Sequence, residues 1–139
     1  MTREETTKIL AILSAAYPRD YKNMTPEEAN GVVSVWQMQF HDMPADIVFM
    51  ALNKHIGSNK FSPTPAEIKE NITHLHWEAA AMLNYGRSIG ANEISKEEKK
   101  EYQRIMLYTD KYRMNSGLSI KELLPFKNSN LLLEKGSSE

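Results

Sequence analysis

The chain contains no cysteine, and this absence excludes disulfide bonds, thiolate catalysis and cysteine-bound zinc. It also has no excess of charge of either sign, because 17 basic and 18 acidic side chains give a formal net charge of −1. Proteins that bind nucleic acid without sequence preference normally carry a strong basic excess, so this balance argues against a general polyanion binder. Neither a secretory signal peptide nor an apolar run of membrane length is found. We therefore expect a cytoplasmic protein that makes no membrane contact.

The glycine-rich motifs that bind nucleotides are also missing. No Gly-x-x-x-x-Gly-Lys-Ser/Thr segment occurs, so the chain is not a P-loop ATPase. The segment from Gly86 to Gly90 lacks the preceding strand that a dinucleotide-binding loop requires. We predict a protein that is not an enzyme, hydrolyses no nucleoside triphosphate and needs no cofactor.

What the sequence does contain is a set of helix starts. Four Ser/Thr-x-x-Glu capping boxes begin at Thr2, Thr25, Thr64 and Ser95, and a proline at the first helical position follows two of them. With the apolar periodicity between them, these signals predict helices near 3–16, 26–41, 44–56, 65–85 and 96–114.

Other residues are expected to set helix ends. Pro18 is expected to close the first helix, and Asp42 is expected to open the third, with Pro44 just inside it. Gly57 is expected to end that third helix as its C′ residue. Leu118 to Leu124 can form one more short helix.

The fold class that follows is all-α. We expect a small helical bundle, made of three N-terminal helices plus a long fourth helix, with a helical C-terminal extension. The expected organisation is an N-terminal bundle over residues 1–85, a C-terminal helical segment over 86–127 and a flexible tail over 128–139. A chain of 139 residues is long enough for one domain with an appended segment.

One helix face could hold a metal ion. Glu70, His74 and Glu78 are spaced i, i+4, i+8, and His76 is close by, which is the spacing of a helical carboxylate–histidine site. No other helix supplies ligands at a matching spacing, so an exposed polar edge explains these residues better. We predict no bound metal.

Aromatic side chains of the C-terminal half are the stronger functional signal. The long fourth helix has two apolar faces, and Trp77 and Tyr85 lie on the second. Both intramolecular packing and a partner surface explain such residues, and aromatics are frequent at the centres of interfaces. The candidate partner-binding aromatics are Trp77, Tyr85, Tyr102, Tyr108 and Tyr112.

Basic residues of the fifth helix would form the rim of this surface. The candidates are Lys99, Lys100 and Arg104. Glutamates interleave with them, which favours a solvated face of i,i+4 pairs over a phosphate-binding surface. Weak or no direct binding of nucleic acid is expected.

Four segments of the N-terminal half carry a family resemblance. They are Leu13-Ser14-Ala15-Ala16-Tyr17-Pro18, the helix around Trp36, Ala51-Leu52-Asn53-Lys54-His55-Ile56 and Phe61-Ser62-Pro63-Thr64-Pro65-Ala66-Glu67-Ile68. In order and spacing, roughly residues 5–72 resemble the phage-encoded loader/inhibitor proteins of replicative helicases from Gram-positive hosts. The residues that carry the motif are Tyr17, Trp36, Phe61, Pro63, Thr64, Pro65, Glu67 and Ile68. In this motif Phe61 is taken as an apolar anchor.

The resemblance implies a function in phage DNA replication. Such proteins have no enzymatic activity; they bind the hexameric replicative helicase in the cytoplasm of the bacterial host, restrain it and help deliver it to an origin-bound initiator. The resemblance also implies that the N-terminal part folds as a small helical unit and that the C-terminal part is flexible and engages the helicase.

Two other kinds of function remain open at this point. A different helical interaction module, such as a virion-assembly chaperone or a helix-turn-helix transcriptional regulator, is one. The absence of a basic recognition helix counts against the regulator. An enzyme with a helical carboxylate–histidine metal site is the other.

Overall fold

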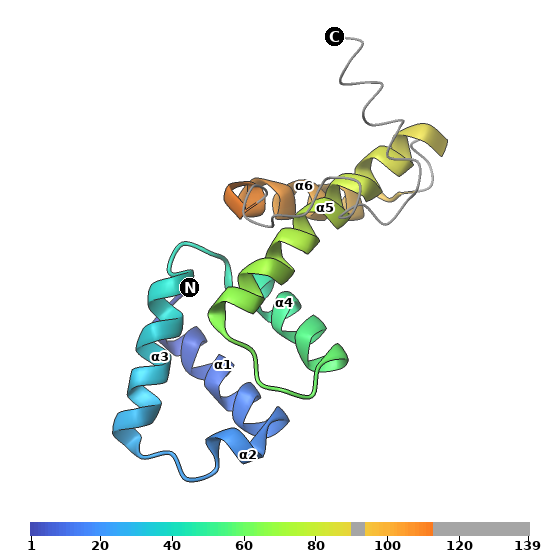
Figure 1. Ribbon diagram of the computed structural model, residues 1–139. Helices are drawn as coiled ribbons and strands as arrows, with labels where there is room; N and C mark the ends of the chain where they lie inside the picture. Colours follow the sequence, from blue (N-terminus) through green and yellow to red (C-terminus); the bar gives the residue numbers. More distant parts are fainter. Residues whose placement is uncertain (90–93, 113–139) are drawn as a thin grey trace. The chain divides into compact units, whose positions relative to one another are not determined.

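A computed structural model describes residues 1–89 and 94–112, with side chains for all of these except 85–89. The described residues contain helices and no β-strand, which confirms the all-α class. The elements are α1 (Arg3–Ala16), α2 (Pro18–Tyr21), α3 (Pro26–Phe40), α4 (Ala45–Ser58), α5 (Pro65–Ile89), α6 (Lys96–Thr109) and a 3-10 turn, η1 (Asp110–Tyr112). Figure 1 shows their arrangement. The expected short helix between Leu118 and Leu124 and the tail from residue 128 lie outside the described residues.

The four predicted capping signals are confirmed. At each start, the backbone N–H of the glutamate three residues on donates to the cap hydroxyl, so one of the unpaired donors of the first turn is satisfied. Thr2 and Thr64 make the complete box, because their own N–H groups donate to Glu5 at 2.8 Å and to Glu67 at 3.1 Å. Thr2 also lowers the pKa of Glu5, since its backbone N–H and then its hydroxyl stabilise the carboxylate. The hydroxyls that accept are those of Thr2, Thr25, Thr64 and Ser95.

Three of the expected helix boundaries were wrong. The long fourth helix does not end at residue 85, because α5 continues to Ile89. Asp42 does not cap α4; Pro44 is the N-cap, and no side-chain hydrogen bond serves it. The carbonyl of Pro44 accepts the N–H groups of the first turn instead. Gly57 does not end α4 either, because the helix continues through it to Ser58 and then turns extended at Asn59, with φ −139°. An extended exit needs no left-handed residue, so the helix can end one residue after the glycine.

Pro18 does close α1, but it also opens a helix that the sequence did not predict. Proline is tolerated at a first helical position, where its missing N–H has no partner to lose. Here it begins the four-residue helix α2, while the N–H of Tyr17 completes the end of α1 by donating to the carbonyl of Leu13 at 2.8 Å.

The chain divides into two compact units, Met1–Ile72 and Thr73–Glu139, so the boundary falls within α5. The boundaries expected from the sequence, after residues 85 and 127, stay predictions.

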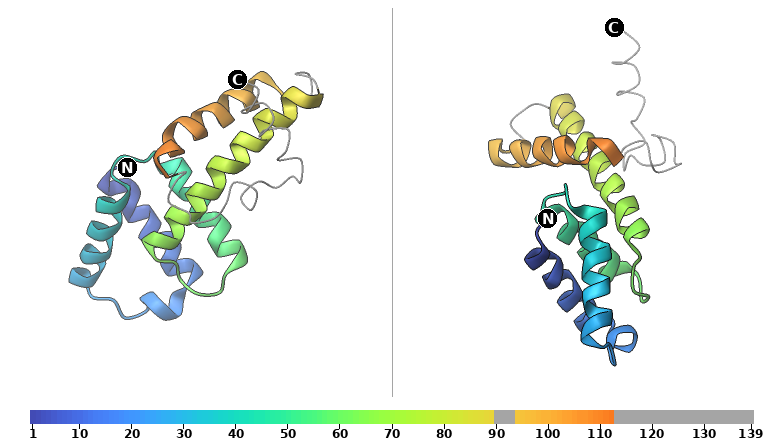
Figure 2. Two further views of the ribbon diagram at one scale, coloured as in Figure 1. Left: turned by 45° about the horizontal axis from the view of Figure 1, so that its top comes forward. Right: turned by 90° about the vertical axis from the view of Figure 1, so that its left-hand side faces the viewer.

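The first unit places α1 in contact with α2, α3 and α4, as Figure 2 also shows. Its core combines α1, α3, α4 and the first turns of α5. Trp36 and Phe40 are both buried, with ring centroids 5.7 Å apart, which confirms their expected place in the core. The other buried apolar residues are Ile9, Leu13, Tyr17, Val33, Met43, Ile47, Val48, Ala51, Leu52, Ile68 and Ile72.

The described part of the second unit is a pair formed by α6 and the part of α5 from Thr73 onward. Small side chains of α5, Ala79 to Ala81, are buried together with Ile105 and Tyr112 of the α6–η1 segment. No helix among residues 1–89 and 94–112 is long and apolar enough to cross a bilayer.

The buried position of Trp36 predicts its contribution to stability. We expect Trp36→Ala to lower the free energy of unfolding by about 3–5 kcal/mol, because the indole leaves a cavity beside Phe40. Val35 is the matched control, since it is the preceding residue of α3 and is 49% exposed. Val35→Ala should change the free energy by no more than about 0.5 kcal/mol. Urea unfolding followed by circular dichroism measures both free energies. Equal losses of stability in the two variants would contradict the placement of Trp36 in the core.

Candidate protein-interaction surfaces

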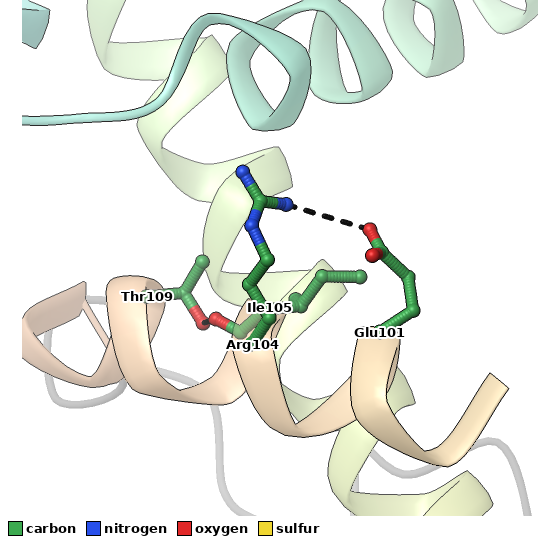
Figure 3. Close-up of polar contacts among 4 residues, drawn as sticks. All are labelled: Glu101, Arg104, Ile105 and Thr109. Atoms are coloured by element: carbon green, nitrogen blue, oxygen red, sulfur yellow. Dashed lines mark hydrogen bonds and ion pairs between the residues drawn. The ribbon is translucent and has the colours of Figure 1, made fainter. Parts of the chain in front are cut away.

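A short chain of polar contacts holds α6 on α5. The hydroxyl of Thr109 donates to the carbonyl of Ile105 at 2.6 Å, within α6 (Figure 3). Its oxygen can then accept, so His76 Nδ1 carries a proton and donates to it at 2.9 Å. One helical turn earlier on α5, the hydroxyl of Thr73 donates to the carbonyl of Tyr112 at 3.0 Å. Buried polar groups that are paired in this way fix one arrangement, so α6 has one defined face toward α5.

The opposite side of α6 is exposed and carries two large apolar side chains. We call Lys99, Lys100, Arg104, Leu107 and Tyr108 the α6 outer face. Leu107 is 73% exposed and Tyr108 44% exposed. The guanidinium of Arg104 lies 5.5 Å from the centroid of the Tyr108 ring, and it also pairs with Glu101 at 3.5 Å. Figure 3 shows Arg104 reaching toward Glu101. A cation–π contact of this kind contributes about 0.5–1 kcal/mol at an exposed site.

The other predicted partner-binding residues differ in how far their side chains are exposed. Lys99 and Lys100 are exposed, and Tyr102 is half-buried. Tyr112 is only 6% exposed, so it holds η1 in place and offers little surface. The side chain of Tyr85 lies outside the described part of the chain. The partner-binding role of the whole set stays a prediction.

Trp77 is half-buried beside the pair of helices. Its ring meets the ring of His76 edge to face, with centroids 5.1 Å apart. Its indole Nε1 is buried and has no hydrogen-bond partner within the described residues. A buried donor without a partner lowers stability. The indole N–H of Trp77 is therefore a donor that a partner group could satisfy.

Leu107 is the surface residue that sequence reasoning missed. A signal for it exists, because residues two apart on a helix point about 200° away from each other at 100° per residue. Ile105 faces α5, so Leu107 had to face away. The sequence alone does not say which of the two sides of α6 would meet α5.

In the first unit, the motif residues meet around one loop. We call residues Asn59 to Thr64 the Phe61 loop. Tyr17 donates its hydroxyl proton to the carbonyl of Asn59 at 2.8 Å, and the oxygens of Tyr21 and Ser62 lie 2.7 Å apart. The chain after α4 is thereby tied to the end of α1 and to α2.

A buried histidine makes the third tie. His55 Nε2 lies 2.8 Å from the carbonyl of Phe61, and since a carbonyl only accepts, this nitrogen carries the proton. The His55 ring also meets the Tyr17 ring, with centroids 6.4 Å apart. Pro63 is buried, and the Thr64 capping box begins α5 directly after it. Polar groups and a proline therefore hold the whole loop in one conformation.

The side chain of Phe61 is not the apolar anchor that the sequence predicted. It is 67% exposed, although the backbone on both sides of it is tied down. Buried Pro63 and fully buried Ile68 supply the anchoring instead. The ammonium of Lys60 lies 5.8 Å from the centroid of the Phe61 ring. Beside the ring is an open, shallow hollow of about 540 Å³ lined by the residues from Ile56 to Phe61.

The structure assembles no metal site from the candidate helix face. Among the described residues, no three histidine, aspartate or glutamate side chains come close enough to hold one ion. His76, one of the candidates, is buried in contact with Thr109, and His74 is half-buried.

Comparison with known proteins gives one match. Residues 1–69 match the family model for the N-terminal domain of a phage helicase loader/inhibitor, which confirms the resemblance over the N-terminal half. No curated protein and no solved structure matches the chain. The matched segment contains Tyr17, Tyr21, His55 and the Phe61 loop.

The Tyr17 contact predicts a pH-dependent stability difference. Tyr17→Phe removes the hydrogen bond to the Asn59 carbonyl and should lower the free energy of unfolding by about 1 kcal/mol at pH 7. Burial raises the pKa of Tyr17 above its ordinary value of 10.0. The unfolded chain therefore loses this proton first, and the wild type loses stability as the pH rises above that value. The phenylalanine variant has no such loss. The difference in free energy of unfolding between wild type and Tyr17→Phe should therefore become smaller as the pH rises.

Urea unfolding at about pH 7, 9 and 10.5, which bracket the ordinary tyrosine pKa, measures this difference. Tyr108→Phe is the control at pH 7, because its ring is exposed on α6, and it should change stability by less than about 0.5 kcal/mol. A wild-type advantage over Tyr17→Phe that stays constant at all three pH values would refute the assignment.

Proposed function

We propose that this chain, whose residues 1–69 match the N-terminal domain of a phage helicase loader/inhibitor family, is a non-enzymatic replication protein. It binds a hexameric replicative helicase, restrains it and helps deliver it to an origin-bound initiator. The observation that carries this proposal is the family match. The geometry supports it, because α6 leaves two large apolar side chains, Leu107 and Tyr108, exposed on one face.

The helicase-binding surface in this proposal is the α6 outer face. One side of α6 is committed to α5 by buried contacts of Thr109 and Ile105. The other side exposes Leu107 and Tyr108. An amphipathic helix with apolar anchors on one face is a common way to fill a groove on a partner protein. Trp77 and Tyr102 of the same unit are further candidate contacts, and Tyr85 is a candidate from the sequence alone. Tyr112 is buried and acts by holding η1 in place.

The mechanism is stoichiometric occupation rather than chemistry. A bound α6 would cover or displace surfaces that helicase subunits need as they pass through their ATP-driven cycle. Lys99, Lys100 and Arg104 surround the apolar centre, and charges at a rim mainly speed encounter and suppress wrong partners. The initiator would release the helicase by competing for the complex. Contact with nucleic acid is weak or absent in this scheme.

The exposed apolar pair predicts the outcome of an interface experiment. We expect the double variant Leu107→Ala, Tyr108→Ala to weaken binding to the purified helicase hexamer by about 30-fold or more, as removal of hot-spot residues does. Lys99→Glu with Lys100→Glu should act mainly on the association rate, with an effect that fades in high salt. Surface plasmon resonance measures both.

A control variant and a shortened chain test whether the helicase-binding surface lies on α6. Met38→Ala removes a side chain that is 69% exposed on α3, and it should leave helicase affinity within about twofold of wild type. A chain that ends at Asn84 keeps the matched N-terminal segment and lacks α6, so it should lose the helicase. If the shortened chain binds as well as the whole chain, the helicase site lies in the first unit and this assignment fails.

A further inference from the structure

One exposed face of α3 has no function in the scheme described so far. It carries Gly31, Ser34, Val35 and Met38, which we call the α3 stripe, and α3 forms one side of the first unit (Figure 1). We propose that the α3 stripe joins two copies of this chain, with their α3 helices packed antiparallel about a two-fold axis between Ser34 and Val35. The association itself does not rest on the proposed function.

The first argument is the apolar and uncharged character of the stripe. Met38 is 69% exposed and Val35 is 49% exposed. Residues 29–41 contain no aspartate, glutamate, lysine or arginine, whereas 25% of the whole chain is charged. The solvent side of a surface helix normally carries charged residues, and burying a charge is costly. A second protein surface can therefore cover the middle of α3 without desolvating a charge of the helix itself.

The second argument is the glycine of the stripe. Gly31 lies in the interior of a helix, where glycine lowers stability relative to alanine. Among the described residues, no atom lies within 4 Å of the position that its Cβ would take. Packing inside the chain therefore does not require a glycine at this position. A missing side chain does allow another helix to approach the backbone closely.

The third argument is that the stripe is complementary to itself. In a two-fold contact, residue i of one copy meets residue j of the other, and j then meets i. Gly31 and Met38 lie equally far from an axis between Ser34 and Val35. The methionine of each copy therefore fills the space above the glycine of the other, and the interface contains this contact twice.

The fourth argument is charge. Glu28 and Gln39 lie on one flank of α3, because they are separated by about three helical turns. The ammonium of Lys69 donates to the side-chain oxygen of Gln39 and lies 5.9 Å from the centroid of the Phe40 ring. This flank is therefore acidic near the start of α3 and basic near its end. Antiparallel two-fold pairing brings the start of a flank beside the end of the same flank in the other copy, so Glu28 of each copy lies near Lys69 of the other.

Arg3 limits the strength of the contact. Its guanidinium donates to the hydroxyl of Ser34 at 3.2 Å, on the flank opposite Gln39 and near the axis. Both copies of Arg3 thus come to the same side of the pair and repel each other. One helix face is also smaller than the roughly 800 Å² per partner that stable complexes bury. We therefore expect weak association, with a Kd of about 0.1 mM.

A weak contact of this kind forms where copies are held close together. Copies bound side by side on one helicase hexamer are at an effective concentration of about 1 mM, which exceeds the expected Kd. The stripe would then link neighbouring copies on the ring. Only this setting, and not the association itself, rests on the proposed function.

The test measures self-association of the full-length chain by analytical ultracentrifugation, from about 10 µM to about 1 mM, a range that brackets the expected Kd. Gly31→Gln places a side chain where Met38 of the other copy must fit, and it should weaken association at least about 10-fold. Met38→Ala should weaken it about 5-fold. Leu107→Ala is the matched control, because Leu107 is 73% exposed on α6, and it should associate as wild type does.

Gly31→Gln should have the opposite effect on the stability of the single chain. At about 10 µM, where the expected Kd makes the protein monomeric, its Tm should rise by about 2–6 °C. Glutamine is the better helix former, and its Cβ meets no atom among the described residues. A variant that is more stable yet associates less has lost an interface and not its fold.

The absence of cysteine allows a test of the antiparallel arrangement. A single introduced cysteine has no other thiol in the chain to react with, so a disulfide can form only between two copies. Val35→Cys lies beside the axis and should form a linked dimer on mild oxidation at least about 10-fold faster than Phe61→Cys, whose position is 67% exposed in a loop. Adding Gly31→Gln to Val35→Cys should reduce its rate to that of Phe61→Cys.

Four outcomes would overturn the inference. A wild-type chain that stays monomeric to about 1 mM has no such contact. Association that Leu107→Ala removes and Gly31→Gln does not would place the contact on α6. Equal cross-linking rates at positions 35 and 61 exclude the two-fold axis, and this result decides the question if Gly31→Gln fails to fold. A monomeric wild type whose affinity for the helicase falls in Gly31→Gln assigns the stripe to the helicase instead.

Discussion

The hydrogen bond from His55 to the carbonyl of Phe61 fixes the loop on which the path from α4 to α5 depends. It is 2.8 Å long and its donor is buried. Through it, the end of α4 controls where the chain turns before α5 begins. Tyr17 of α1 and Tyr21 of α2 contact the same loop, so side chains of three helices fix its path. An unpaired imidazole at this depth would be costly, and this gives the loop a single conformation.

The second unit depends on a smaller set of buried contacts. His76 and Thr109 pair across the two helices, and the alanines of α5 are buried. The directional hydrogen bonds of Thr73 and His76 determine which side of α6 is turned toward α5. The orientation of α6 in turn leaves Leu107 and Tyr108 exposed. The same buried contacts therefore define both the fold of this unit and its proposed interaction surface.

The features predicted correctly from the sequence are local. A capping box needs only residues three apart, so the starts near Thr2, Thr25, Thr64 and Ser95 could be found without any tertiary information. The apolar stripe that holds Trp36 and Phe40 has a period that only a helix satisfies, so their burial followed as well. The likeness of residues 1–69 to a helicase loader/inhibitor family was visible for the same reason, because the motif is a series of such local signals.

The features that were missed depend on contacts distant in sequence. Gly57 could remain helical because the chain leaves α4 in an extended conformation that Tyr17 and His55 hold in place. Leu107 is exposed because His76 fixes which side of α6 is buried. Phe61 is exposed because the backbone around it already has its partners and needs no apolar anchor.

The sequence by itself determined the helices, their caps and the core stripe, since those follow from backbone hydrogen bonding and periodicity. Only the tertiary structure decided which apolar side chains remain on the surface, since that depends on what each helix packs against.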